Sequence, residues 1–424
     1  MLMKEMYDVV VAGGGLTGAA AAVAAKRNGL KDVLLVERYG FLGGMATSGL
    51  VNPFMSYFKA GTNRKEENQL IFGIFQEILD RLEELGGLKN KITFDAEIMK
   101  LVLNRIITEE GVNILFHTYV TSVNKDKNSE NRIESIKISN KSGNTDVKGK
   151  IFIDCTGDAD IAFMAGVPCK KGREQDGYSQ PMTMCFRVAN VDRSKMPSRE
   201  EINRIYTEAV SRGEITNPRE NVLFFDTIHE DVIHFNTTRI VKKDATNAEE
   251  LTEAELMVRE QCWEMFNFLK KYIPGFENSY LQLTAPQIGI RESRRIVGKY
   301  VLTEEDVLQG RKFEDSVCYC AYTIDIHNPA GTGTVIKRLN TGDYYGIPYR
   351  CLLPLNIENL LVAGRPISST HEAHSSLRIM PTCTALGEAA GTAAALSIIN
   401  QITPGELDPI ILRKKLMENK AIKF

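Results

Sequence analysis

The chain has 424 residues, a formal net charge of −2, 43% hydrophobic residues and 25% charged residues. A chain of this length can bury a large core and form two domains. Its balanced charge gives no polyelectrolyte signature, so we expect no nucleic-acid partner. No run of about 18 apolar residues occurs and the first residues lack a signal-peptide pattern, so we expect no membrane span and no leader sequence.

The eight cysteines are scattered along the chain without a C-x-x-C motif. This usage fits a reducing cytoplasm, which is the expected location. Cys318 and Cys320 lie two apart, on one face of an expected strand. Two sulfurs alone do not complete a metal site, so we interpret them as core residues, with a redox role as the alternative. We expect no bound metal.

The stretch "YDVVVAGGGLTGAAAAVAAKRNG" predicts a strand over residues 7–12, a glycine turn and an alanine-rich helix. Gly13, Gly15 and Gly18 follow the G-x-G-x-x-G spacing. In a dinucleotide site the first glycine permits a tight turn, the second lets the backbone approach a pyrophosphate, and the third lets the helix pack on the strand. The helix N-terminus then offers free amides to the phosphates.

A second predicted strand, "KDVLLVE", ends at Glu37, nineteen residues after Gly18. A carboxylate at this distance accepts hydrogen bonds from ribose hydroxyls and repels a 2′-phosphate, which argues against NADP. A glycine-rich turn in another α/β fold is the alternative, but it does not account for Glu37. The motif therefore predicts dinucleotide binding.

The remaining pattern departs from that of a simple NAD-binding domain. A glycine-rich loop follows Glu37, and helices are predicted over residues 69–85 and from Asp95 to Ile106. Residues 111–123, 132–140 and 146–158 form an expected three-stranded antiparallel excursion. An acidic helix is expected near residues 247–268, and Pro381 and Thr382 start a small-residue helix after a buried strand near residue 360.

Several blocks together resemble the FAD-dependent oxidoreductase family of the glutathione-reductase-like flavoprotein fold. They are the glycine motif, Glu37, "FLGGMATSG", "IDCTGDADIAFMAG", "RESRRIVG", "DIHNPAGTG", "YGIPYRCLLP" and "NLLVAGRPISSTHEAHSSLRIMPTCTALGEAAG". The chain is more distantly similar to fumarate reductase and succinate dehydrogenase flavoprotein subunits. The resemblance implies FAD as cofactor, bound noncovalently because no histidine follows Gly43 and Gly44.

The resemblance also implies which residues contact the cofactor. Gly43, Gly44 and Thr47 are expected along the ribityl-pyrophosphate, Val120 near the adenine, and residues 156–158 back at the nucleotide. The full set expected at FAD is Gly13, Gly15, Leu16, Thr17, Gly18, Glu37, Arg38, Gly43, Gly44, Met45, Ala46, Thr47, Val120, Thr156, Gly157, Asp158, Gly364, Arg365, Arg378, Met380 and Thr382.

Three segments supply candidates for the chemistry. "THEAHSSLR" is expected as a loop over the flavin in which His371 or His374 donates a proton or binds substrate, with a capped surface loop as the alternative. The resemblance favours His371 over His374. "RESRR" places Arg291, Arg294 and Arg295 around Glu292. Two interpretations are open for these arginines: a structural ion pair, or two parallel hydrogen bonds from one guanidinium to a substrate carboxylate. We expect one arginine in each role.

Asp325 and His327 are two apart on one face of a short expected strand, an arrangement suited to proton transfer; a hydrogen-bonded turn is the alternative. Tyr345, Tyr349 and Arg350 are expected to roof the flavin and the substrate. The predicted catalytic set is thus His327, His371, Arg291, Arg294, Asp325, Tyr345 and Arg350.

These observations predict an α/β fold. Residues 1–171 and 341–424 would form a discontinuous Rossmann-like FAD-binding domain of the glutathione-reductase type, and residues 172–340 an α+β substrate or cap domain. The expected function is hydride transfer between flavin N5 and a small organic substrate, with a carboxylate among the candidates. The electron partner is open, and a homo-oligomer is one option. An electron-transfer or regulatory subunit is the alternative, although such proteins carry iron–sulfur cysteine motifs that this chain lacks; flavin-dependent RNA modification is disfavoured by the charge.

Overall fold

A parallel sheet carries the nucleotide end of the molecule in the computed structural model, which describes residues 3–423. Its central strands are buried on both faces, as the β-branched runs predict. Val9 of the central strand pairs with Val33 on one side and Ile151 on the other, and Leu361 pairs with Ile153. The strand order is β5 (Asn113–Leu115), β2 (Val33–Val36), β1 (Tyr7–Ala12), β8 (Gly143–Asp154) and β19 (Leu360–Val362).

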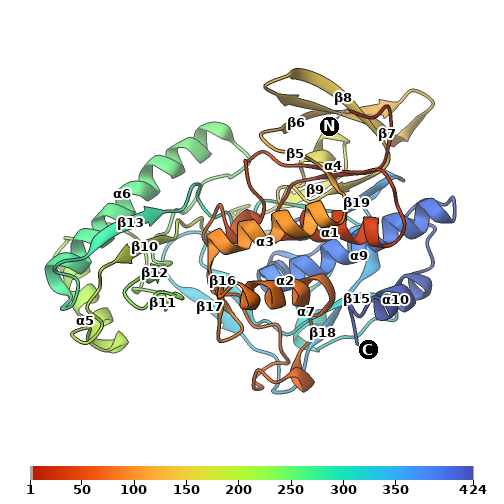
Figure 1. The fold of residues 1–424 in the computed structure, drawn as a ribbon. Coiled ribbons are helices and arrows are strands. Elements are labelled where there is room, and N and C mark those ends of the chain that lie inside the picture. Colours follow the sequence, from red (N-terminus) through yellow and green to blue (C-terminus); the bar gives the residue numbers. More distant parts are fainter. Residues whose placement is uncertain (1–2, 424) are drawn as a thin grey trace.

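Helices α1 (Leu16–Arg27) and α9 (Met380–Ile399) run next to each other against this sheet (Figure 1). They approach closely because Gly387 and Gly391 face α1: a Cβ at these positions would lie 2.0 Å from the Thr17 oxygen and 2.1 Å from the Ala21 oxygen. The predicted start of α9 at Pro381 is confirmed to within one residue. By length and hydropathy α9 alone among helices of the described residues could cross a membrane, but 83% of its apolar window is buried in the core.

The region between β2 and β8 contains two helices and the predicted antiparallel excursion. Asp95 caps α3 (Ala96–Glu109) by accepting from the amides of Glu97 and Ile98, as expected. Helix α2 (Gly73–Glu84) starts four residues later than predicted, because the Leu70 amide donates to the Tyr57 oxygen at 2.9 Å and keeps the chain extended. The excursion is confirmed as an antiparallel ribbon of β6 (Tyr119–Asp126), β7 (Ser129–Asn140) and the first half of β8. Its first predicted strand, residues 111–123, is divided, because β5 pairs in parallel with β2 and not with the ribbon.

A second core lies to one side of the nucleotide-binding sheet, on the left in Figure 1. It combines an antiparallel sheet with two amphipathic helices, one of which contains the predicted acidic segment. Apolar residues from Met182 to Ile290 fill it. The elements, in sheet order and then chain order, are β11 (Phe224–Asp226), β12 (Ile233–Phe235), β10 (Phe186–Ala189), β13 (Tyr280–Thr284), α5 (Arg199–Ser211) and α6 (Ala248–Tyr272).

The predicted domain boundary at residue 340 differs from this division of the cores. Strand β15 (Ser316–Cys320) pairs across it with β18 (Tyr345–Pro348), and both contribute to the nucleotide-side core. The apolar β15 packs on α9, which explains why this segment belongs with the first core. Hairpin β16 (Ile324–His327)–β17 (Thr334–Lys337) extends from it. The remaining elements are β3 (Leu88–Lys89), β4 (Thr93–Phe94), α4 (Asp160–Met164), β9 (Cys169–Lys171), β14 (Arg294–Ile296), α7 (Glu304–Leu308), α8 (His371–Leu377) and α10 (Pro409–Glu418).

Candidate active site

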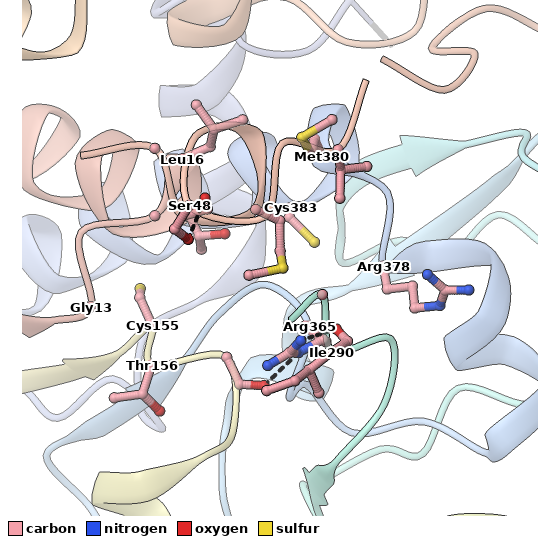
Figure 2. A pocket seen from close by; sticks show the side chains of 18 of the residues that line it. Gly13, Leu16, Ser48, Cys155, Thr156, Ile290, Arg365, Arg378, Met380 and Cys383 are labelled. Carbon is pink, nitrogen blue, oxygen red and sulfur yellow. Dashed lines mark hydrogen bonds between the residues drawn. The ribbon is translucent and has the colours of Figure 1, made fainter. Parts of the chain in front are cut away.

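One cavity of about 440 Å³ runs from the glycine turn after β1 to the second core. Figure 2 shows how distant segments meet around it: Gly13 and Leu16 from the first turn, Thr156 after β8, and Arg378 from the C-terminal third. Their convergence follows from the sheet, because β1, β8 and β19 are parallel neighbours whose carboxyl ends share one edge.

The glycine turn leaves a backbone groove that fits a pyrophosphate. Gly13 has φ +95°, and a Cβ there would lie 2.3 Å from the Cys155 oxygen, so a side chain does not fit. At Gly15 the nearest atom to an added Cβ is 3.8 Å away, so this backbone is bare toward the cavity it lines. A second glycine turn approaches from the other side: a Cβ at Gly44 would lie 2.9 Å from the Gly15 Cα.

Glu37 lies at the end of β2 and lines the cavity, as a ribose-binding carboxylate would. Its carboxylate accepts from the amides of Gly14 at 2.5 Å and Tyr39 at 2.8 Å, which fixes its orientation. Burial raises the pKa of Glu37. Arg38 also lines the cavity and donates to Gln287 at 2.9 Å.

The other expected nucleotide contacts fall into two groups. Leu16, Thr17, Gly43, Met45 and Val120 line the cavity, as do Thr156, Gly157, Arg365, Arg378 and Met380. The second group supports the lining from behind and consists of Gly18, Ala46, Thr47, Asp158, Gly364 and Thr382, none of which lines the cavity in the described chain.

The supporting residues have clear structural roles. Asp158 pairs with Arg365 at 2.6 Å, which holds the turn after β8 against the C-terminal segment. Gly18 permits the close packing of α1, since a Cβ there would lie 1.8 Å from the Gly13 oxygen. The Thr47 hydroxyl donates to the Leu42 oxygen at 2.7 Å and closes the second glycine turn. The bare backbone, the ribose-type carboxylate and the two glycine turns therefore fit FAD.

At the end of the cavity away from the glycine turns, the lining contains cationic side chains. Arg291 and Arg378 both line it, together with Asp325 and His327. Arg291 donates to the Pro181 oxygen at 2.7 Å and to Asn236 at 3.4 Å, and no carboxylate among residues 3–423 is hydrogen-bonded to it. Burial, with the charge of Arg378 next, lowers the pKa of Arg291 to about 9. A buried cation without an anionic partner is costly, so this end of the cavity suits an anion.

His327 lies in the arginine-rich end, and its side chain is 12% exposed. Burial lowers its pKa well below the ordinary value, and the charges of Arg291 and Arg219 lower it further. Its Nε2 lies 3.9 Å from Asp325 Oδ1, beyond hydrogen-bond range, while the Tyr322 hydroxyl donates to Asp325 Oδ2 at 3.1 Å. The ring is therefore neutral at ordinary pH.

Four residues of the predicted catalytic set do not line the cavity, which corrects their expected positions. Arg350 pairs with Asp315 at 2.8 Å and its side chain is 45% exposed, because it lies in the short helix Tyr349–Leu352 after β18 and faces outward. Tyr345 is fully buried and its hydroxyl lies 2.7 Å from that of Ser376, so it packs behind α8. Arg294 pairs with Asp160 at 3.0 Å.

His371 also lies behind the lining, because its segment is a helix and not the predicted loop. Residues 371–377 form α8, capped by Thr370. His371 Nδ1 is 2.9 Å from Glu292, and Arg295 pairs with the same carboxylate. In this buried triad, Arg295 has the role of the structural ion pair expected for one arginine of the cluster. Arg291 is the arginine of the cluster that faces the cavity.

The second core contributes lining that the sequence did not identify. Leu223, Phe225, Thr183 and Asn236 come from its sheet and loops, and Tyr322 precedes β16. The alternation of "IHFN" carried a signal, since Ile233 and Phe235 face the second core while Asn236 faces the opposite side. Without knowledge of which face meets the nucleotide domain, that signal could not be assigned.

The family of the chain follows from this fold and site. The fold is an α/β Rossmann-like FAD-binding domain with a mixed sheet and an additional antiparallel sheet. The model of the FAD-dependent oxidoreductase family matches residues 8–416, so the chain belongs to that family and is an FAD-dependent oxidoreductase acting on a small molecule. No curated protein shows significant similarity to it.

Comparison with solved structures gives distant matches. A geranylgeranyl bacteriochlorophyll reductase-like protein from Thermoplasma acidophilum is 13% identical, with a TM-score of 0.47 over 99% of this chain and 84% of that one. The p-nitrophenol 4-monooxygenase PnpA from Pseudomonas putida DLL-E4 is 11% identical, with a TM-score of 0.47 over 99% and 87%. Both are too distant to indicate a substrate.

Proposed function

We propose that the protein transfers a hydride between the flavin N5 of noncovalently bound FAD and a small organic acid. When bound, the flavin supplies the two-electron step. The observation that carries the proposal is Arg291, which is only 8% exposed, lines the cavity and is hydrogen-bonded only to neutral acceptors among residues 3–423. A substrate carboxylate would supply the missing negative charge and match the planar fork of the arginine.

The rest of the cavity end supports a substrate with an apolar body. Leu223, Phe225 and Met55 offer apolar lining next to the arginines. Such walls exclude water and strengthen the pairing between a carboxylate and Arg291. Arg378 donates to Gln180 at 3.2 Å, is half-buried and lines the same cavity, so two cations can hold one anionic group. His327 then takes the proton that accompanies hydride transfer.

A screen of small acids with matched uncharged analogues tests the proposal. FAD-loaded protein is mixed anaerobically with each acid and with its amide, and loss of the visible flavin absorbance is recorded. We expect reduction by one or more acids and not by the corresponding amides. Equal reduction by acid and amide would contradict the anionic substrate, and a protein that fails to take up FAD would contradict the whole proposal.

Arg291→Gln separates substrate binding from cofactor binding. The substitution should leave FAD bound and raise KM for the acid roughly tenfold or more, which is at least about 1.4 kcal/mol. The matched control is Arg350→Gln, which removes an arginine from an exposed ion pair outside the cavity. If both variants behave alike, Arg291 is not the anion-binding residue.

Three further assignments belong to this proposal. The second core, residues 182–290, is proposed as the substrate cap, supported by the lining that it contributes. A cytoplasmic location is proposed because all eight cysteines are free. The electron partner is proposed to be a separate molecule that reaches the flavin through the same cavity.

A further inference from the structure

A second cavity lies further along helices α1 and α9, away from the glycine turns. Its volume of about 760 Å³ is within the range of ordinary small-molecule sites. Ala24 of α1 and Glu388 of α9 line it, about two helical turns after Leu16 and Met380, which line the first cavity. The two cavities share no lining residue in the described part of the chain, so this second cavity is a separate site.

A buried carboxyl group lines this second cavity. Glu388 is 4% exposed and lies in a helix whose sequence is otherwise uncharged. Its Oε2 accepts from the Ile74 amide at the start of α2 at 2.9 Å, and its other oxygen receives no hydrogen bond from residues 3–423. Gly73 leaves the carboxyl group uncovered, since a Cβ there would lie 2.3 Å from Oε2 and 2.7 Å from Oε1. The cavity therefore contains one open, negatively charged acceptor.

No cation of the described chain is hydrogen-bonded to Glu388. Burial raises its pKa to about 7, although the Ile74 amide and the charge of Arg27 lower it. Arg27 pairs with Glu77 at 2.7 Å and so does not neutralise the buried carboxyl group. A buried carboxylate with a single hydrogen bond is costly, and a cation beside it would remove much of that cost. The charged side chains that line the cavity around it are Arg27, Glu66, Glu77, Asp80, Lys420 and Lys423.

The rest of the lining favours an organic ammonium ion over a metal ion. Ala24, Ile74 and Ile422 are buried and give the cavity apolar walls. The Phe72 ring also lines it and already holds an ammonium group, that of Lys423, 4.1 Å from its centroid. The described residues contain no group of three side chains placed to hold a metal, whereas calcium and magnesium take about six or more oxygen ligands. One carboxylate and apolar walls therefore match one ammonium group with an apolar body.

We propose that this second cavity binds a small organic ammonium ion, with the charged nitrogen at Glu388 and the apolar part against Ala24, Ile74 and Ile422. The ammonium group donates to the Glu388 oxygen that no group of residues 3–423 reaches. Its charge favours the ionised carboxylate, so a protonated Glu388 releases its proton to water when the cation binds. The site is independent of the proposed function, because it involves neither the flavin nor Arg291.

Calorimetric titration of FAD-loaded protein with n-hexylammonium chloride tests the site, and n-hexanol is the matched uncharged probe. We expect saturable one-to-one binding of the ammonium ion, and binding of the alcohol at least about tenfold weaker. Because the pKa of Glu388 before binding is about 7, the dissociation constant of the ammonium ion should fall about tenfold from pH 6 to pH 8. Titrations in two buffers that differ in ionisation enthalpy should show proton release at pH 6. Equal binding of the alcohol, or an affinity that does not change with pH, would overturn the proposal.

Glu388→Gln tests which group holds the cation. The glutamine retains an oxygen that accepts from the Ile74 amide but has no charge, so binding should weaken at least about tenfold at pH 8 and proton release should disappear. The matched control is Glu418→Gln, which removes a carboxylate paired with Lys415 of α10, outside the cavity lining. It should bind the probe as wild type does. Wild-type binding by Glu388→Gln, or equal losses in both variants, would exclude Glu388. No hydride transfer is measured, so failure here is distinct from failure of the acid screen.

Discussion

Gly13 and Gly15 lie two residues apart in one turn, yet the structure makes different demands on them. Gly13 has φ +95° and no room for a Cβ, whereas Gly15 has φ −63° and open space. Gly13→Ala should therefore destabilise the fold by about 2–4 kcal/mol through left-handed strain and overpacking. Gly15→Ala should change stability by less than about 0.5 kcal/mol but weaken FAD binding roughly tenfold, because its methyl group occupies the pyrophosphate groove.

Two measurements separate these effects. Denaturant unfolding of the FAD-free variants gives the free energy of unfolding, and titration of FAD gives the dissociation constant. If Gly15→Ala bound FAD as tightly as wild type while remaining folded, the pyrophosphate would not lie on this turn.

Glu388 predicts a pH dependence of stability. It is 4% exposed in α9, and burial raises its pKa to about 7, although it accepts from the Ile74 amide at 2.9 Å. A carboxyl whose pKa is raised by folding lowers the free energy of unfolding, and this loss grows as the pH rises from the pKa of the unfolded chain to about 7. Glu388→Gln should therefore be more stable than wild type by about 2–3 kcal/mol at pH 8 and equally stable near pH 4. Unfolding curves at both pH values check this, and a pH-independent difference would contradict it.

At the scale of elements, the contact between α1 and α9 sets the width of the core beneath the nucleotide. Gly391 touches the Ala21 backbone, so a methyl group there must push the helices apart. Gly391→Ala should lower the free energy of unfolding by about 1–3 kcal/mol, despite the higher helix propensity of alanine. Gly331→Ala is the matched control, since no atom lies within 4 Å of an added Cβ there. Thermal unfolding of both variants tests this prediction. If Gly391→Ala were more stable than wild type, the contact between α1 and α9 would have room for a methyl group.

At the scale of the whole molecule, Arg365 joins three distant segments. It donates to the Gly157 oxygen at 2.7 Å, to Asp158 at 2.6 Å and to the Ile290 oxygen, linking the turn after β8, the end of the second core and the C-terminal segment. Because its side chain is only 13% exposed, Arg365→Gln should cost about 3–5 kcal/mol. Unfolding of Arg350→Gln, whose ion pair is exposed, should differ from wild type by less than about 1 kcal/mol. Similar losses in both variants would contradict a bridging role for Arg365.

Local sequence determined the parts of this protein that depend on neighbours along the chain. The β-branched run of β1, the glycine spacing, Asp95 at the start of α3 and the antiparallel excursion were all predictable, because backbone sterics and hydrogen-bond periodicity act over a few residues. The family resemblance extended this to FAD.

Only the tertiary structure decided which charged residues face the cavity. Arg291, Arg294 and Arg295 are neighbours in sequence, but one lines the cavity, one pairs with Asp160 and one pairs with buried Glu292. Their roles depend on which strand and which core each side chain meets, and those partners lie more than a hundred residues away for Arg294. The sequence by itself determined that a dinucleotide binds at the first turn. The packing of the two cores decided which arginines and which histidine line the cavity, because burial and charge at a site are set by groups that only folding brings together.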